Sequence, residues 1–288
     1  MTAPEFRLRT LENRKGRPLA SRWYAPRGEP LGAVLIAPAI GVPQRFYRDF
    51  AGWLAERGYL TVTFDYLGIG ESLPGSLRAL DVNVSDWGRD DGSAVLDAVA
   101  AAAGDLPLFW LGHSLGAQIL PLVEGHQRIA RIITIAAGSG YWRDNSPQIR
   151  RQAWLLWHGL APVLTSLFGY FPGKRIGAVG DLPAGVIRQW RRWCLHPEYL
   201  VGAEGEPMQR AFNAVTTPLV SLSFSDDEMM SAQNTASLHG FYRSAPKTMH
   251  RIAPRDVGVE RIGHFGFFRP TLREALWEPH LLPALAPA

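Results

Sequence analysis

The length and composition of the chain indicate a globular protein. It has 288 residues, of which 47% are hydrophobic and 19% charged, so it has enough apolar surface for a core and is not an intrinsically disordered chain. No run of about 18 apolar residues is present, which excludes a membrane-spanning helix. The single Cys194 has no partner for an internal disulfide. The first residues also lack the apolar stretch of a signal peptide, so we expect a cytoplasmic protein.

The charge balance does not favour a nucleic acid as partner. The net charge is only +4, from 30 basic and 26 acidic residues. Two short basic clusters lie at residues 13–17 and 188–193. They are better explained as a polar turn and as the solvent face of an amphipathic helix than as a patch for an anionic ligand. We expect a small-molecule substrate and no nucleic-acid or membrane partner, and the oligomeric state stays open.

Strand-like and helix-like segments alternate along the chain, which is typical of an α/β sheet. The first two strands flank a turn at 14–16 and predict an antiparallel hairpin. The predicted strands cover residues 6–11, 19–24, 33–37, 59–64, 106–111, 129–136, 217–224 and 247–252. The predicted helices cover residues 46–57, 84–103, 149–160, 184–195 and 272–281, with a short one from Gly116. Ser85 is the expected N-cap of the helix at 84–103.

This alternation stops between about Tyr141 and Phe212. The stretch is too long for a plain loop, and apolar residues recur at helical spacing in two parts of it. We therefore predict a core of residues 1–140 and 213–288, interrupted by a mainly helical insertion at 141–212. Five of the ten Trp residues of the chain lie in this insertion: Trp142, Trp154, Trp157, Trp190 and Trp193.

The strongest chemical signal is the sequence Gly112-His113-Ser114-Leu115-Gly116, which directly follows an apolar strand and precedes a helix. A serine on such a sharp strand-to-helix turn presents its hydroxyl above the sheet. The flanking glycines suit the turn because a Cβ at either place would collide with neighbouring backbone. We therefore predict that Ser114 is a nucleophile.

A serine nucleophile needs a base, and the base needs an acid that orients it. On this architecture the acid and then the histidine follow the serine in the chain. Asp226, Asp227 and Glu228 lie just past a predicted strand, and His264 lies in a Gly-flanked loop after the last one. We predict His264 as the base and one of the three acids as its partner, with the other two at a solvated loop edge. The remaining histidines are expected to be structural: His113 should point away from the face of the nucleophile, and His126, His239 and His280 should lie near the surface.

These residues, in this order, resemble the α/β-hydrolase fold superfamily. The turn Asp65-Tyr-Leu-Gly-Ile-Gly-Glu-Ser72 is similar to an Asp-x-x-Gly-x-Gly-x-Ser turn that many members carry. Within the superfamily, the chain resembles the esterase-like and serine-aminopeptidase-like hydrolases and a group of bacterial predicted α/β-hydrolases. The resemblance implies a mostly parallel central sheet flanked by helices, with the insertion as a helical cap. It also favours Asp227 over Asp226 as the acid.

The resemblance also implies an oxyanion hole, with one departure from the family's pattern. Many relatives carry His-Gly after the strand that corresponds to 33–37, whereas this chain has Ala37-Pro38-Ala39-Ile40-Gly41. Pro38 has no N–H and offers no hydrogen bond. The expected donors are therefore the amide of Leu115 and that of either Ala39 or Ile40.

A Ser114–His264–Asp227 triad predicts acyl chemistry without a metal or an organic cofactor. We expect a serine hydrolase that cleaves a carboxylic ester or a related acyl compound, with the five Trp of the insertion contributing to a substrate pocket for medium-length apolar acyl groups. The alternatives are an acyltransferase or an aminopeptidase with the same triad and, less favoured, a non-catalytic ligand-binding protein.

Overall fold

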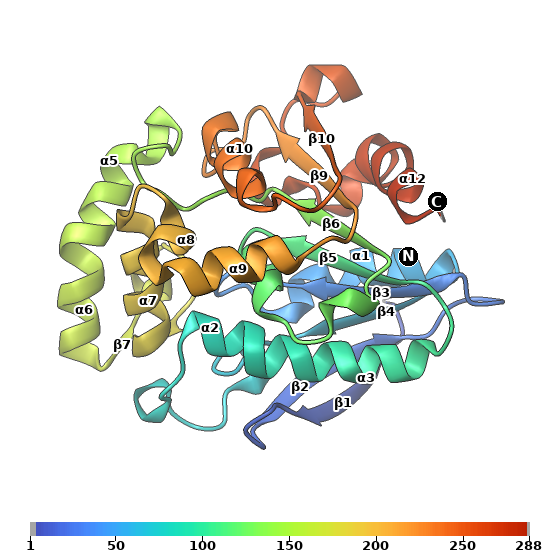
Figure 1. The fold of residues 1–288 in the computed structure, drawn as a ribbon, viewed down its shortest axis with the longest axis horizontal. Coiled ribbons are helices and arrows are strands. Elements are labelled where there is room, and N and C mark those ends of the chain that lie inside the picture. Colours follow the sequence, from blue (N-terminus) through green and yellow to red (C-terminus); the bar gives the residue numbers. More distant parts are fainter. Residues whose placement is uncertain (1–3, 287–288) are drawn as a thin grey trace.

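The structure is a computed structural model, and it describes residues 4–286. Within this range eight strands form one sheet in the order β1-β2-β4-β3-β5-β6-β9-β10 (Figure 1). Its strands are β1 (Arg7–Glu12), β2 (Pro18–Tyr24), β3 (Gly32–Ala37), β4 (Tyr59–Phe64), β5 (Leu108–His113), β6 (Arg131–Ile135), β9 (Leu219–Phe224) and β10 (Lys247–Ile252). The pairs β1–β2 and β2–β4 are antiparallel, and the pairs from β4 through β10 are parallel. The predicted hairpin and the predicted fold class are confirmed.

Alternate residues of the central strands face opposite layers of the core, as the two-residue period of a strand requires. In β3, Val34 and Ile36 join one apolar cluster and Leu35 joins the other. The first cluster includes α1 (Arg48–Glu56) and the C-terminal helices, and the second includes α3 (Ser93–Ala103). Helices therefore cover both faces of the sheet, and the carboxyl ends of the parallel strands stay free to carry loops (Figure 1).

The described core contains five further helices. They are α2 (Val84–Asp86), α4 (Leu115–Gln118), α10 (Ala232–Phe241), α11 (Gly263–Gly266) and α12 (Leu282–Leu285). Turns of 3-10 helix cover Gln44–Tyr47, Gly70–Ser72, Leu77–Ala79, Leu120–Leu122, His126–Arg128, Gly173–Ile176, Pro254–Val257 and Pro270–Leu272, and π-helical turns cover Trp87–Gly92, Leu156–Leu160 and Arg273–Leu281. No helix of residues 4–286 combines the length and the apolarity that crossing a lipid bilayer requires.

The helix predicted at 84–103 is interrupted, and its predicted N-cap is wrong. It begins with α2, passes through the π-helical turn and continues as α3. Asn83 caps it instead of Ser85: the Asn83 side chain accepts a hydrogen bond from the Asp86 amide, and the Asp86 carboxylate accepts one from the Asn83 amide. The amide of Ser85 donates to the Gln189 side chain, 104 residues away, at 2.9 Å. Ser85, the predicted N-cap, therefore lies inside the helix, and its amide forms a tertiary hydrogen bond.

Residues 141–212, the insertion, lie between β6 and β9 and extend to one side of the sheet (Figure 1). Their helices are α5 (Pro147–Leu155), α6 (Ala161–Phe168), α7 (Ala184–Leu195), α8 (Tyr199–Glu204) and α9 (Glu206–Ala214), and α9 runs two residues past the range. A two-stranded ladder of β7 (Tyr170–Phe171) and β8 (Leu182–Pro183) is separate from the main sheet.

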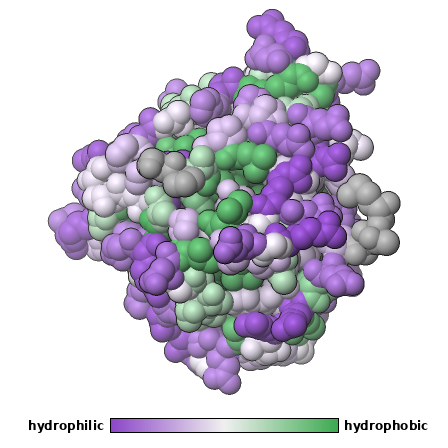
Figure 2. All heavy atoms as spheres, turned by 90° about the vertical axis from the view of Figure 1, so that its right-hand side faces the viewer, coloured by the Kyte–Doolittle hydropathy of each residue, from purple (hydrophilic) through white to green (hydrophobic). Residues whose placement is uncertain are grey.

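On the face of the molecule seen from the right-hand side of Figure 1, apolar side chains gather in the middle and hydrophilic ones around them (Figure 2).

Candidate active site

Ser114 occupies a strained turn between β5 and α4. Its backbone has φ 50° and ψ −111°, a region that residues other than glycine occupy only when the surrounding structure holds them there. A Cβ on Gly112 would lie 2.5 Å from the Ala117 nitrogen, and one on Gly116 would lie 2.2 Å from the Ala37 oxygen. Both contacts are with backbone, so neither glycine tolerates a side chain. The sharp turn holds the serine at the carboxyl end of β5, the edge of the sheet that carries the loops.

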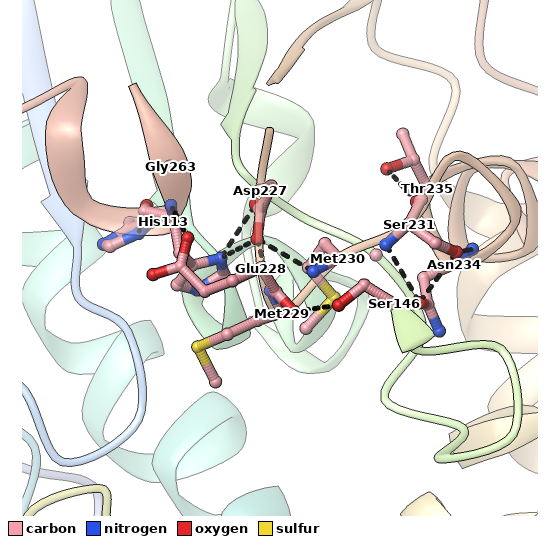
Figure 3. A network of polar contacts seen from close by, with 12 residues as sticks. His113, Ser146, Asp227, Glu228, Met229, Met230, Ser231, Asn234, Thr235 and Gly263 are labelled. Atoms are coloured by element: carbon pink, nitrogen blue, oxygen red, sulfur yellow. Dashed lines mark hydrogen bonds and ion pairs between the residues drawn. The ribbon is translucent and has the colours of Figure 1, made fainter. Parts of the chain in front are cut away.

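His264 and Asp227 are brought together from two different loops. His264 lies in α11 after β10, and Asp227 lies after β9. The Nδ1 atom of His264 is 2.9 Å from Oδ2 and 3.1 Å from Oδ1 of Asp227, with both side chains 1% exposed. The Asp227 carboxylate also accepts hydrogen bonds from the amides of Met229 and Met230, each at 2.8 Å (Figure 3). These bonds hold the Asp227 carboxylate in place. The carboxylate contacts the imidazole of His264 at Nδ1 and not at Nε2.

The two acids next to Asp227 are partly exposed, with the Glu228 side chain 35% accessible, and both also bind the histidine loop. Asp226 accepts hydrogen bonds from the amides of Ile262 and Gly263, at 2.8 and 3.1 Å. Glu228 accepts one from the His264 amide at 3.2 Å and lies 3.4 Å from the guanidinium of Arg261. All three consecutive acids therefore bind the histidine loop: one holds the imidazole ring, and the other two hold the backbone that carries it.

The acid loop is also attached to the start of the insertion. The Ser146 hydroxyl donates to the backbone carbonyl of Glu228, and the Ser231 hydroxyl donates to that of Asp144 at 2.6 Å. Ser231 additionally caps α10, where it accepts from the Asn234 amide. Figure 3 shows Ser146 beside the acid loop, and Ser231 with Asn234 a few residues further along it. The position of Asp227 therefore depends on the insertion as well as on the core.

Of the three predicted oxyanion donors, Ala39 is wrong. Its amide donates to the hydroxyl of Tyr47 at 2.9 Å, so it is not free to bind a substrate oxygen. The Ile40 amide has no acceptor among the described residues. Leu115 is the first residue of α4, and the first N–H of a helix has no partner within the helix. Pairing of Ala37 with Gly112 places the loop that carries Ile40 next to the serine turn.

The ring contacts and side-chain hydrogen bonds of the five predicted substrate-binding Trp lie within the insertion. Trp157 and Trp190 are buried and pack edge to face with ring centroids 4.8 Å apart. Trp193 is buried and donates from Nε1 to Glu204 at 2.6 Å. Trp154 is 52% exposed, and Trp142 packs partly buried against the core with Arg143 over its ring. Within residues 4–286, no hydrogen bond or ring–ring contact joins any of them to Ser114 or His264, and a role in substrate binding stays a prediction.

The site is enclosed. Ser114 is 5% exposed and His264 1%. The loop of residues 38–41, which carries the expected donors Ala39 and Ile40, is called the oxyanion loop below. The insertion contacts it directly, because a Cβ on Gly180 would lie 2.4 Å from the Gly41 carbonyl oxygen. A cavity of about 430 Å³ lies elsewhere, among Arg131, Leu219 and Lys247. These residues begin β6, β9 and β10, so the cavity lies at the opposite edge of the sheet from Ser114.

Two histidines differ from expectation in their burial. His126 and His239 are buried rather than near the surface, and burial lowers the pKa of His239 to about 4. His113 is fully buried, with Nδ1 2.9 Å from the Tyr47 hydroxyl and Nε2 3.1 Å from the carbonyl oxygen of His264. Sequence reasoning missed Tyr47 altogether, because no motif links it to the serine turn.

A family model of known proteins matches about half of the chain. A family model described as serine aminopeptidase, S33, matches residues 28–170. The match includes the oxyanion loop and the serine turn, and it ends before Asp227 and His264. No curated protein matches the chain.

Similar solved structures cover nearly the whole chain at low sequence identity. DcsB in complex with its substrate analogue has a TM-score of 0.64 at 12% identity, over 98% of this chain and 99% of that one. A soluble variant of the monoglyceride lipase from Saccharomyces cerevisiae has a TM-score of 0.61 at 18% identity, over 88% and 86%. The esterase domain of a Rhodothermus marinus protein has a TM-score of 0.60 at 19% identity, over 97% of each chain. At these identities the likeness establishes a shared fold.

Proposed function

Because the chain belongs to the α/β-hydrolase superfamily, we propose that it is a serine hydrolase that cleaves a carboxylic ester or a related acyl compound. The observation that carries the proposal is the buried pair of His264 and Asp227, 2.9 Å apart, at the same sheet edge as a serine in strained backbone. Strain of this kind is retained where it serves a function, and an imidazole oriented by a carboxylate is the base that a serine nucleophile needs.

In the proposed reaction Ser114 Oγ attacks the acyl carbonyl carbon while Nε2 of His264 takes its proton. Asp227 holds the ring by Nδ1 and stabilises the imidazolium that forms. The imidazolium then returns the proton to the leaving alcohol, which departs as the acyl-enzyme forms. Water attacks the acyl-enzyme with His264 again as base, and the released acid frees Ser114. The cycle needs no group beyond these three side chains and two amides.

The amides of Leu115 and Ile40 are the proposed oxyanion donors. Both N–H groups lack acceptors in the described part of the chain, and the pairing of β3 with β5 places their loops side by side. Donors that are already oriented stabilise the negative oxygen of the tetrahedral intermediate, and removing one typically costs about 3 kcal/mol of transition-state stabilisation.

We propose that the insertion at 141–212 acts as a cap that selects the substrate. It contacts the oxyanion loop through Gly180 and the acid loop through Ser146, so it borders the site on two sides. Its composition favours an apolar acyl group of medium length, because aromatic and aliphatic side chains predominate and such side chains line most small-molecule pockets.

An aminopeptidase with the same triad is the second candidate, because the matching family model carries that description. Recognition of a substrate amine would require a carboxylate that is not already occupied. Near His264, however, Asp226 and Glu228 are bound to backbone amides of the histidine loop. This arrangement favours the ester. An acyltransferase would use the same triad with an alcohol or amine in place of water.

The decisive experiment is labelling with a fluorophosphonate probe together with turnover of p-nitrophenyl esters of graded chain length. The intact protein should be labelled and should hydrolyse the esters, and both properties should vanish in Ser114→Ala and His264→Ala. Equal labelling of Ser114→Ala would overturn the assignment. Faster cleavage of aminoacyl anilides than of esters would indicate the aminopeptidase, and faster product formation with an added alcohol would indicate the acyltransferase.

A further inference from the structure

A buried row of hydrogen bonds joins the oxyanion loop to the loop of His264. The Ala39 amide donates to the Tyr47 hydroxyl, and that oxygen is 2.9 Å from Nδ1 of His113. Nε2 of His113 is 3.1 Å from the backbone carbonyl oxygen of His264. Tyr47 and His113 are both fully buried. Three separate segments of the core therefore meet through two side chains.

The direction of every hydrogen bond in this row follows from chemistry. A carbonyl oxygen only accepts, so Nε2 of His113 must carry the hydrogen. Nδ1 of a neutral imidazole is then an acceptor, and the Tyr47 hydroxyl must donate to it. The hydroxyl oxygen in turn accepts from the Ala39 amide. Burial, reinforced by the neighbouring His264, lowers the pKa of His113 well below its ordinary value, which keeps the imidazole neutral and in this one tautomer.

Tyr47 is itself held in place. It ends the 3-10 turn Gln44–Tyr47, and Asp65 accepts a hydrogen bond from the Gln44 amide at the start of that turn, at 2.7 Å. The Tyr47 ring packs edge to face against Phe268, with ring centroids 4.9 Å apart. The Asp-x-x-Gly-x-Gly-x-Ser turn that begins at Asp65 carries none of the proposed catalytic groups. Its hydrogen bond to the Gln44 amide explains why it stands beside the site.

We propose that Tyr47 and His113 are positioning residues that set the oxyanion loop and the base relative to each other. This inference rests on the proposed serine hydrolase function. By binding the Ala39 amide, the Tyr47 hydroxyl turns that N–H away from the substrate and leaves the amide of Ile40 as the oxyanion donor. By binding the His264 carbonyl, His113 holds the backbone behind the base. Neither side chain touches the substrate.

This arrangement gives a physical reason for the departure at Pro38. The chain lacks the His-Gly that many relatives carry at this place, and Pro38 supplies no amide. The loop conformation must then be fixed from outside the loop, and the Tyr47 hydroxyl is the group that binds it. Sequence spacing left Ala39 and Ile40 as equal candidates, whereas the hydrogen bond from Ala39 to Tyr47 distinguishes them.

The test compares Tyr47→Phe with the matched control Tyr59→Phe. Tyr59 is also buried, and its hydroxyl lies 3.5 Å from the backbone carbonyl of Leu285, in a segment remote from Ser114. We expect Tyr47→Phe to lower kcat for p-nitrophenyl esters between about tenfold and a hundredfold, with KM little changed, because the oxyanion donor is misplaced rather than deleted. Tyr59→Phe should keep the wild-type kcat.

A second variant separates positioning from a purely structural role. If Tyr47 and His113 act as one unit, the double variant Tyr47→Phe/His113→Leu should lose no more than about the larger of the two single losses. Imidazole ¹⁵N spectra should show that Tyr47→Phe shifts the Nδ1 resonance of His113, which loses its hydrogen-bond donor, while the Nε2–H that binds the His264 carbonyl is retained. A lower Tm with unchanged kcat and an unchanged Nδ1 resonance would overturn the inference, and so would multiplicative losses in the double variant.

The outcome also separates this inference from the proposed function. If Ser114→Ala is inactive and Tyr47→Phe turns over like the wild type, only the positioning role fails. If Ser114→Ala keeps full activity, the serine hydrolase assignment fails whatever Tyr47→Phe does.

Discussion

The core and the insertion hold their side chains in different ways. At the carboxyl ends of the core strands, Asp226, Asp227 and Glu228 each bind a particular donor in the histidine loop. In the insertion, Trp157 and Trp190 hold the helices together by ring packing, and the outer face exposes Leu155 and Leu167. Directional bonds fix atoms to a few tenths of an ångström, whereas apolar packing tolerates changes of shape. The difference suits the proposed division between a rigid reaction centre and a more adaptable cap.

Charge follows the same division. The helices α5, α6 and α7 contain five Arg, namely Arg150, Arg151, Arg188, Arg191 and Arg192, and no acidic residue. The acids of the site lie in the loops of the core, where backbone amides neutralise them. The insertion therefore contributes no carboxylate from these three helices that would bind a substrate amine, in agreement with the proposed ester substrate.

The largest expected effect tests the core side of the comparison. Asp227→Asn should lower kcat by about 10⁴-fold, because the amide no longer stabilises the imidazolium or its tautomer. Asp226→Asn keeps one acceptor for the amides of Ile262 and Gly263 and should lose far less. Steady-state hydrolysis of a p-nitrophenyl ester measures both variants. Equal losses in the two would mean that the acids share the role, contrary to the separate bonds seen here.

The next effect tests the insertion through stability. Trp157→Ala removes a buried ring that packs on Trp190 and should lower the free energy of unfolding by about 3–5 kcal/mol. Trp154→Ala removes a half-exposed ring and should change that free energy by no more than about 0.5 kcal/mol. Urea denaturation compares the two. A large loss from the exposed Trp154 would show that the outer face is covered in solution.

A pH-dependent effect concerns a core residue far from the triad in sequence. Asp91 is buried and accepts hydrogen bonds from Asn13 and from the Leu67 amide, at 2.7 and 2.8 Å. Burial raises its pKa from 3.8 to about 7. Between these values the folded protein binds a proton that the unfolded chain does not bind. Its contribution to the free energy of unfolding should therefore rise as the pH falls from above 7 toward 4, by at most about 4 kcal/mol.

Urea titrations at pH 5, 6, 7 and 8 would show this contribution as the difference between the wild type and Asp91→Asn, which lacks the titrating group. The buried histidines act in the opposite direction, so the difference between variants is the informative quantity. Asp105→Asn changes an exposed carboxylate and should keep the wild-type pH dependence. A parallel pH dependence in Asp91→Asn and the wild type would contradict the raised pKa.

The smallest expected effect lies at the contact between the two regions. Gly180→Ala places a Cβ against the Gly41 carbonyl oxygen, and the oxyanion loop or the insertion must shift to accommodate it. We expect kcat to fall about tenfold, the loss that a displaced rather than a deleted donor causes. Gly159→Ala, also in the insertion, is the control, because its added Cβ would meet only the Leu155 side chain at an ordinary contact distance of 3.5 Å. Similar kcat values in the two would mean that the contact does not affect the site.

Much of the fold could be predicted from the sequence because its signals are local. Apolar runs predicted the strands, and the resemblance predicted their assembly into an α/β-hydrolase sheet. The spacing of Gly112, Ser114 and Gly116 reports a turn that only such residues form, and α7 has the predicted bounds of 184–195. What could not be predicted depends on side-chain contacts that no local pattern indicates. Ala39 is excluded as a donor by the hydroxyl of Tyr47, eight residues along the chain, and Asn83 rather than Ser85 caps the helix.

The acids illustrate the same limit. Composition places Asp226 and Glu228 in a polar loop, and nothing in their neighbours indicates that backbone amides some 36 residues later need acceptors. The role of the Trp residues stays a prediction for a related reason, since helical spacing does not distinguish packing between helices from lining a pocket.

The contact between Gly41 and Gly180 has a consequence for how such a protein can diverge. The outer face of the insertion helices can change with little effect on the core, because its side chains, such as Leu155 and Leu167, are exposed. Two backbones that meet without side chains leave no such freedom, since a larger residue on either one separates them. Descendants of this chain could therefore acquire new substrates by altering α5, α6 or α7, provided that these two positions remain glycine.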